Sequence, residues 1–171
     1  DPASLDWIEA NGDDIAAVMV EPLQSRHPDL RPQAFLQKLR ALTEASGSAL
    51  VFDEIVTGFR VHPAGMQAVF GIRADMATYG KVVGGGMPIG ILAGKARFMD
   101  ALDGGAWRYG DDSIPETAPT FFAGTFVRHP LVLAAARAVL LHLKEHGPEL
   151  QERLAARTAG LVERLNRDLE R

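Results

Sequence analysis

Two short apolar segments separated by a stretch of helical length constrain the fold of this chain more than any other feature. Residues 15–20 (IAAVMV) and 49–53 (ALVFD) have the length and apolar character of buried strands. The residues between Pro32 and Ser46 have apolar side chains at helical spacing, and Gly47 follows as a typical helix stop. A strand–helix–strand unit implies two parallel strands joined by a right-handed crossover. These residues therefore predict an α/β fold.

A carboxylate stands at the end of each apolar segment. Glu21 follows the first segment, and Asp53 is the last residue of the second. Ligands of open parallel sheets bind beyond the carboxyl ends of the strands, so both residues are candidate site residues. A buried carboxylate without a partner is costly, which leaves simpler alternatives open. Asp53 then caps a helix or pairs with Arg60, and Glu21 caps a turn at the strand end.

Glycine and proline divide the rest of the chain into further predicted elements. These are short strands at 75–79 and 89–93, a short helix at 95–102, a long surface loop at 103–120, a helix at 130–146 and an amphipathic helix from the Gly147-Pro148 break to Arg171.

The composition excludes several classes of function. The 18 Lys and Arg residues are scattered and the formal net charge is -4, which argues against a nucleic-acid-binding surface. The chain has no cysteine, so it has no disulfide, thiol nucleophile or Cys-ligated metal, and a cytoplasmic location is expected. No apolar run approaches the ~20 residues that span a bilayer.

Two further residues are candidates for binding a ligand, Lys81 through an aldehyde and Thr125 through a phosphate. Lys81 has apolar or glycine neighbours, and a dry pocket would lower the pKa of its amine, as Schiff-base formation requires. Alternatively, Lys81 is a solvated residue of a flexible glycine loop. GKVVGGG lacks the order of a nucleotide phosphate loop, which makes a nucleotide-binding protein the weakest option. Thr125 follows Gly124 and can donate to a phosphate, or it caps the next helix.

The strings VFDEIVTGFR, YGKVVGGGMPIG and FFAGTFVRHP together resemble the class III aminotransferases, and most closely their glutamate-1-semialdehyde aminomutase branch. The resemblance extends from about Ile15 to about His146. It implies that residues 1–129 are part of the large domain of the fold type I transferases that use pyridoxal 5'-phosphate (PLP), a mostly parallel sheet with flanking helices. Residues 130–171 are then helices that lead to the C-terminal small domain.

The resemblance also implies a role for each candidate residue. Lys81 holds PLP covalently and moves a proton between the substrate Cα and C4′ of the cofactor. Asp53 keeps the pyridine nitrogen protonated, so that the ring acts as an electron sink. Thr125 binds the phosphate of the neighbouring subunit's cofactor, which implies a homodimer. Val56 contacts the ring where many relatives place a glutamine, and Glu21 supports the cofactor from the pyridine side.

Two departures from the family pattern bear on the substrate. Ser25 and Arg26 stand where several ω-aminotransferases carry Gly-Glu, so a glutamate switch of the ornithine or GABA type is in doubt. Arg26 or His27 contacts an anionic group, or these charges are simply solvated. Lys81 and Thr125 lie 44 positions apart, which is longer than in free-standing aminomutases.

The phrases EPLQSRHPDL, FRVHPAGMQAVFGIRAD and WRYGDDSIPE resemble aminotransferase domains of hybrid polyketide–peptide synthetases. This implies an amino-acid donor and, as acceptor, a β-ketoacyl thioester on an acyl carrier protein. An aminomutase and a non-catalytic scaffold remain the alternatives. In the family, the phosphate loop and the ring-stacking aromatic precede the position of Asp1, and a small domain follows that of Arg171. The isolated chain is therefore expected to be inactive.

Overall fold

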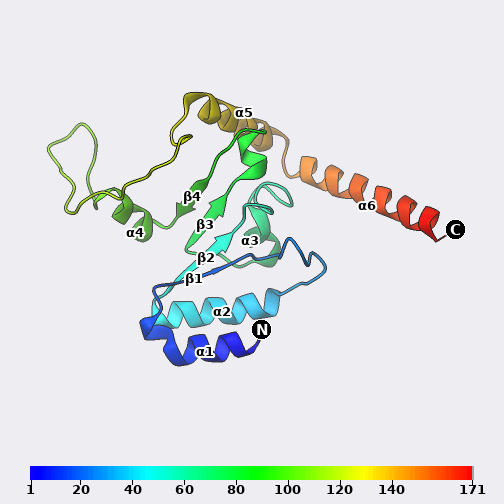
Figure 1. The fold of residues 1–171 in the computed structure, drawn as a ribbon, viewed down its shortest axis with the longest axis horizontal. Helices are drawn as coiled ribbons and strands as arrows, with labels where there is room; N and C mark the ends of the chain where they lie inside the picture. The colour runs from blue at the N-terminus through cyan, green and yellow to red at the C-terminus, as the bar shows by residue number, and fades with distance from the viewer. Residues whose placement is uncertain (171) are drawn as a thin grey trace.

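The computed structural model describes residues 1–170, and a four-stranded sheet lies at its centre (Figure 1). The strands are β1 (Ala17–Val20), β2 (Ala49–Asp53), β3 (Met76–Tyr79) and β4 (Ile91–Gly94), and they lie side by side in this order. β1 and β2 are parallel, as are β2 and β3, whereas β4 runs antiparallel to β3. The predicted α/β class and parallel strand pair are confirmed.

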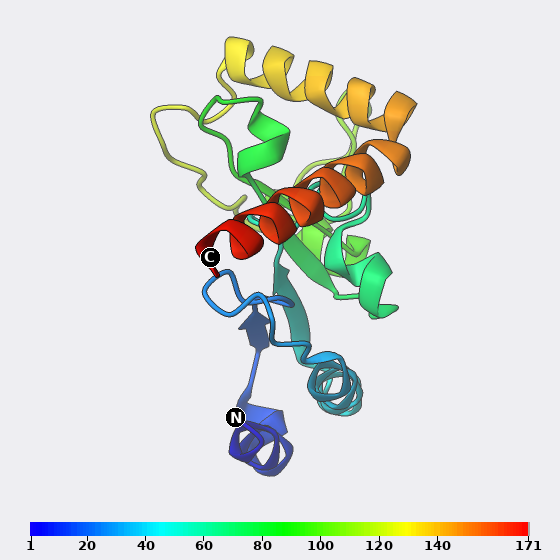
Figure 2. The same ribbon diagram turned by 90° about the vertical axis from the view of Figure 1, so that its right-hand side faces the viewer.

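Helices flank the sheet at opposite sides. Figures 1 and 2 show α1 and α2 side by side at one side and α5 at the other, while α6 extends away from the sheet. The helices are α1 (Ala3–Asn11), α2 (Gln33–Ser46), α3 (Gly65–Phe70), α4 (Ala96–Met99), α5 (Pro130–His146) and α6 (Glu149–Leu169), with 3-10 helices η1 (Gly12–Asp14), η2 (Lys81–Gly84) and η3 (Asp100–Asp103).

The main hydrophobic core lies between β2, β3 and the helices α1, α2 and α3. β2 is buried along most of its length because it has a strand on each side. Leu36 from α2, Phe52 from β2 and Met66 from α3 are almost completely buried in this core. β1 differs from the prediction of a buried strand, because only one of its edges is paired within the described residues. Its residues alternate between exposed and half-buried, and Met19 is 57% exposed.

Most predicted element boundaries agree with the structure. α2 follows Pro32 directly and ends at Gly47, which has the left-handed φ of +79°. α5 has the predicted bounds, and the predicted short helix is divided between α4 and η3. α6 ends at Leu169, and Arg171, the predicted end, lies outside the described residues. The helices α1 and α3 were not predicted.

None of the helices formed by residues 1–170 combines the length and apolar character needed to cross a membrane.

Candidate active site

The parallel register of β2 and β3 brings the Asp53 and Lys81 segments to one edge of the sheet. Asp53, at the carboxyl end of β2, lies opposite Thr78 on β3. β3 ends one residue later, and Lys81 is the first residue of η2. The carboxyl edge of a parallel sheet is the usual place for ligands, as predicted from the sequence.

The two oxygens of the Asp53 carboxylate have different surroundings. Oδ1 accepts hydrogen bonds from the backbone N–H of Ile55 at 3.0 Å and from the hydroxyl of Thr78 at 3.3 Å. Within residues 1–170, no N–H or O–H group donates a hydrogen bond to Oδ2 of Asp53. Arg60 donates to the carbonyl of Val56 instead, so the predicted alternative of an Asp53–Arg60 pair is wrong. The free Oδ2 fits the N–H of a protonated pyridine ring.

Lys81 is exposed and has a φ of +46°, a left-handed conformation that is uncommon for a residue with a side chain. Its Nζ has no hydrogen bond or ion pair within the described residues. The predicted dry pocket around the amine is wrong for this part of the chain. Val83 occupies the inward position of η2 and is fully buried, so the turn directs Lys81 outward. An accessible, unpaired amine still fits covalent binding of an aldehyde.

Glycine and α5 fix the turn that carries Lys81. Gly85 ends η2 with a φ of +58°, and a Cβ at this position would lie 2.8 Å from Cγ2 of Val139 on α5. Only glycine therefore allows the helix to pack this closely on the turn.

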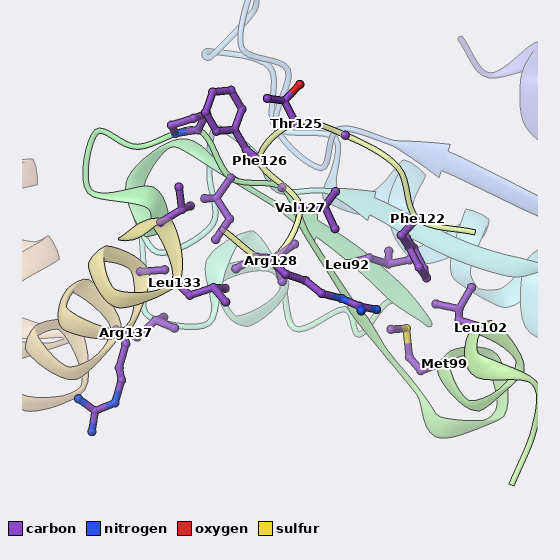
Figure 3. Close-up of a pocket in the computed structure, with 18 of the residues that line it drawn as sticks. Leu92, Met99, Leu102, Phe122, Thr125, Phe126, Val127, Arg128, Leu133 and Arg137 are labelled. Carbon is purple, nitrogen blue, oxygen red and sulfur yellow. The ribbon is translucent and has the colours of Figure 1, made fainter. Parts of the chain in front are cut away.

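Thr125 lies apart from Asp53 and Lys81. It is exposed in the turn that precedes α5, where the N-cap residue is His129 and no side chain caps the helix. The helix-capping alternative is therefore wrong. Figure 3 shows the hydroxyl of Thr125 directed away from the apolar side chains below it. No hydrogen bond among the described residues connects Thr125 with Asp53 or Lys81.

Thr125 contributes to the wall of an open groove of about 1110 Å³ between β4, the 121–128 segment and α5 (Figure 3). The lining is mainly apolar and includes Leu92, Phe122 and Leu133. Asp53 and Lys81 are not among its lining residues, so this groove is distinct from the candidate site.

The remaining predicted residues have mainly local contacts. The carboxylate of Glu21 accepts a hydrogen bond from the backbone N–H of Ser25 at 2.8 Å, which confirms the turn-capping alternative. Val56 is half-buried, and its contact with a cofactor ring stays a prediction. Arg26 and His27 are both exposed on the loop after β1.

Sequence reasoning missed Glu54, the residue after Asp53. Its side chain is fully buried and accepts hydrogen bonds from the Thr57 hydroxyl at 2.6 Å and from the backbone N–H groups of Met66 and Gln67 at 2.9 and 3.1 Å. The available signal was an acidic residue within a largely apolar stretch, directly after a candidate site residue.

Solved structures share this fold. An omega-transaminase from Sphaerobacter thermophilus superposes with a TM-score of 0.70 at 33% identity, over 90% of this chain and 32% of its own. A beta-phenylalanine aminotransferase from Variovorax paradoxus superposes with a TM-score of 0.65 at 38% identity, over 80% of this chain and 29% of its own. A transaminase solved with PLP bound superposes with a TM-score of 0.71 at 30% identity, over 90% of this chain and 34% of its own. The fold is thus the corresponding part of a transaminase of fold type I.

Sequence comparison defines the family. The model of the family "Aminotransferase class-III" matches residues 3–171, and the chain belongs to this family. The glutamate-1-semialdehyde 2,1-aminomutase of Pyrobaculum aerophilum is 41% identical over 92% of this chain and 36% of its own length. The glutamate-1-semialdehyde 2,1-aminomutase 2 of Brevibacillus brevis is 40% identical over 88% of this chain and 33% of its own length. The chain therefore spans about a third of the length of these relatives.

Proposed function

We propose that the protein containing this chain is a PLP-dependent aminotransferase, which moves an amino group from an amino-acid donor to a keto or aldehyde acceptor. The observation that carries this proposal is the register of β2 and β3, because the strand end with Asp53 and the turn with Lys81 then follow at the same edge of the sheet. PLP, when bound, supplies an electron sink for the bonds at the substrate Cα.

Each residue has a defined task in this proposal. Lys81 attaches the cofactor through Nζ, and after release it moves a proton between the substrate Cα and C4′. Asp53 accepts the pyridine N–H at Oδ2, while Thr78 and the Ile55 backbone hold Oδ1. Val56 contacts the ring.

Two further roles concern the surroundings of the site. Glu21 supports the loop after β1 through its bond to Ser25, on the pyridine side of the cofactor. The exposed hydroxyl of Thr125 binds the phosphate in a neighbouring subunit, so the active protein is a homodimer. We place this enzyme in the cytoplasm.

For the acceptor, we propose a β-ketoacyl thioester on an acyl carrier protein. The support is the resemblance of EPLQSRHPDL and WRYGDDSIPE to synthetase-embedded domains. The second phrase lies on a largely exposed segment without helix or strand, at 104–120, where a docked carrier would be accessible. A glutamate-1-semialdehyde aminomutase is the second candidate, and the names of relatives at 40 and 41% identity favour it.

The cofactor proposal is tested by Lys81→Ala in the full-length protein. We expect the wild type to show the visible absorbance of lysine-bound PLP and the variant to lack it, with activity at least ~10²-fold lower. Lys38→Ala, on the exposed face of α2, is the control and should resemble the wild type. If the wild type shows no band with excess PLP, a non-catalytic scaffold is favoured.

The acceptor is tested by supplying glutamate or glutamine as donor with either a carrier-loaded β-ketoacyl thioester or free glutamate 1-semialdehyde. Mass spectrometry of the carrier should show conversion of the ketone to the amine. Turnover of the semialdehyde alone would instead support the aminomutase.

A further inference from the structure

Glu54 is buried without a countercharge. Its side chain has no exposed surface, and no cation pairs with it in the described part of the chain. Its two oxygens instead accept three hydrogen bonds, from the Thr57 hydroxyl and from the backbone N–H groups of Met66 and Gln67. Burial of a carboxylate is costly, so its donors must be held in place. The reaction proposed above gives this group no task.

The three bonds join the start of a segment, directly after Asp53, to its middle and its end. Residues 54 and 67 are the ends of this segment, and the Gly58 N–H also donates to the Glu54 carbonyl at 2.7 Å. Gly65 has a φ of +66°, and a Cβ at Gly65 would overlap the Glu54 carboxylate. The missing side chain at Gly65 therefore leaves the space that the Glu54 carboxylate occupies.

The closed segment packs against the residues that lead to Lys81. The rings of Phe59 and Tyr79 lie 5.2 Å apart, and the amide of Gln67 donates to the Tyr79 hydroxyl at 3.3 Å. A Cβ at Gly80 would be in contact with Ile55 at 3.5 Å. One anchored segment thus supports both the strand end that carries Asp53 and the residues just before Lys81.

The electrostatics of Tyr79 agree with this arrangement. Burial raises the pKa of the Tyr79 hydroxyl above its usual value of 10.0, and the negative charge of Glu54 raises it further, although the bond from Gln67 lowers it. Tyr79 therefore stays protonated and uncharged beside the carboxylate at neutral pH.

We propose that Glu54 is a positioning residue for the cofactor: it fixes the 54–67 segment, which sets the Asp53 carboxylate relative to the Lys81 turn. This inference rests on the function proposed above. Glu54 itself touches neither cofactor nor substrate in this proposal, and it acts through Asp53 and Tyr79.

The test uses the full-length protein with Glu54→Gln and a matched pair at Thr57. A glutamine amide presents its own N–H groups to one of the backbone donors, so the segment loses at least one bond. Thr57→Val removes the hydroxyl donor at nearly constant shape, whereas Thr57→Ser keeps it. Glu9→Gln, exposed on α1, is the charge control.

We expect PLP to bind about tenfold more weakly to Glu54→Gln, and more weakly to Thr57→Val than to Thr57→Ser. The pH midpoint of the absorbance change of lysine-bound PLP should also move by about half a unit or more, because Asp53 is displaced from the ring. A purely structural role would lower thermal stability alone and leave this midpoint unchanged.

The outcomes separate the two proposals. If the wild type shows no lysine-bound PLP, the proposed function itself fails. If the wild type binds PLP and Glu54→Gln has the same affinity and pH midpoint, the positioning role is wrong while the proposed function stands. If Glu54→Gln does not fold, the comparison of Thr57→Val with Thr57→Ser decides, and equal behaviour of this pair overturns the proposal.

Discussion

At the scale of single residues, the asymmetry of Asp53 is the feature with the most direct chemical consequence. Thr78 and the Ile55 backbone occupy Oδ1, so the side chain has one orientation, and Oδ2 is free within the described residues. A carboxylate held in this way can accept a charged N–H with little reorganisation.

Replacement of this carboxylate tests its role. Asp53→Asn retains an oxygen for Thr78, but it presents an amide N–H at the place where the proposed function has Asp53 accept the pyridine N–H. Loss of a charge-assisted hydrogen bond costs about 1.5–3 kcal/mol, so we expect kcat/KM to fall by about 10- to 150-fold. Steady-state kinetics of the full-length protein measure this, with the exposed Asp6→Asn as control. Equal kcat/KM for wild type and Asp53→Asn would contradict the assignment.

The sequence indicated Asp53 and Lys81 as candidates because each stands in a recognisable local setting, at a strand end or within a glycine-rich turn. It did not identify Glu54, whose donors include two backbone N–H groups 12 and 13 residues further along the chain. Backbone donors have no residue-specific signature. The environment of Lys81 was also mispredicted, because apolar neighbours in sequence need not surround a side chain once a turn directs it outward.

At the scale of elements, the sequence predicted the bounds of a helix correctly where the residues at its own ends start or stop it. Pro32 and Gly47 bound α2, and His129-Pro130 begins α5. β1 was mispredicted as buried because burial of a strand depends on its neighbours in the sheet. The helix α3 has only six residues, too few for a helical period to be visible.

The end of α2 provides a test of a purely conformational effect. Gly47 has a φ of +79° and no atom within 4 Å of a Cβ at this position. We expect Gly47→Ala to lower the free energy of unfolding by about 1–2 kcal/mol, because alanine is strained in the left-handed region.

Gly160→Ala is the matched control, since Gly160 lies within α6 and also has open space around it. Alanine is the better helix former, so this change should stabilise the protein by up to about 1 kcal/mol. Urea unfolding of both variants measures the difference. The conformational explanation fails if the two changes have the same sign.

At the scale of the whole molecule, Asp75 connects separate parts of the fold. Its carboxylate contacts Arg40 of α2 at 2.7 Å, Lys95 after β4 at 2.7 Å and the backbone N–H of Leu50 in β2 at 2.9 Å. Burial alone would raise the pKa of Asp75. The bonds from Lys95, Leu50 and Arg40 outweigh burial and lower the pKa from 3.8 to about 2. Sequence alone could not identify this contact, because its partners are far apart in the chain.

This carboxylate predicts a dependence of stability on pH. Since the folded pKa lies below the unfolded value, the stabilisation is complete above about pH 4 and is lost as the pH falls towards 2. This lowering of the pKa contributes at most about 2.5 kcal/mol to the free energy of unfolding. Asp75→Asn should remove this pH dependence and cost about 3–5 kcal/mol at neutral pH, because Arg40 loses its buried partner.

Urea unfolding at pH 7, 4 and 3 measures both effects. Asp112→Asn, in the exposed loop, is the control and should leave the stability at pH 7 unchanged. An Asp75→Asn variant that loses as much stability between pH 4 and 3 as the wild type would show that other carboxylates are responsible.

The antiparallel direction of β4 has a consequence for movement. Tyr79 and Ile91 are paired across the ladder, so residues 80–90 leave the sheet and return to it at the same place. Lys81 is therefore carried on a segment whose two ends are both held by the β3–β4 ladder. A segment held at both ends in this way keeps the Lys81 turn with the sheet, whatever the position of the helices that extend beyond it.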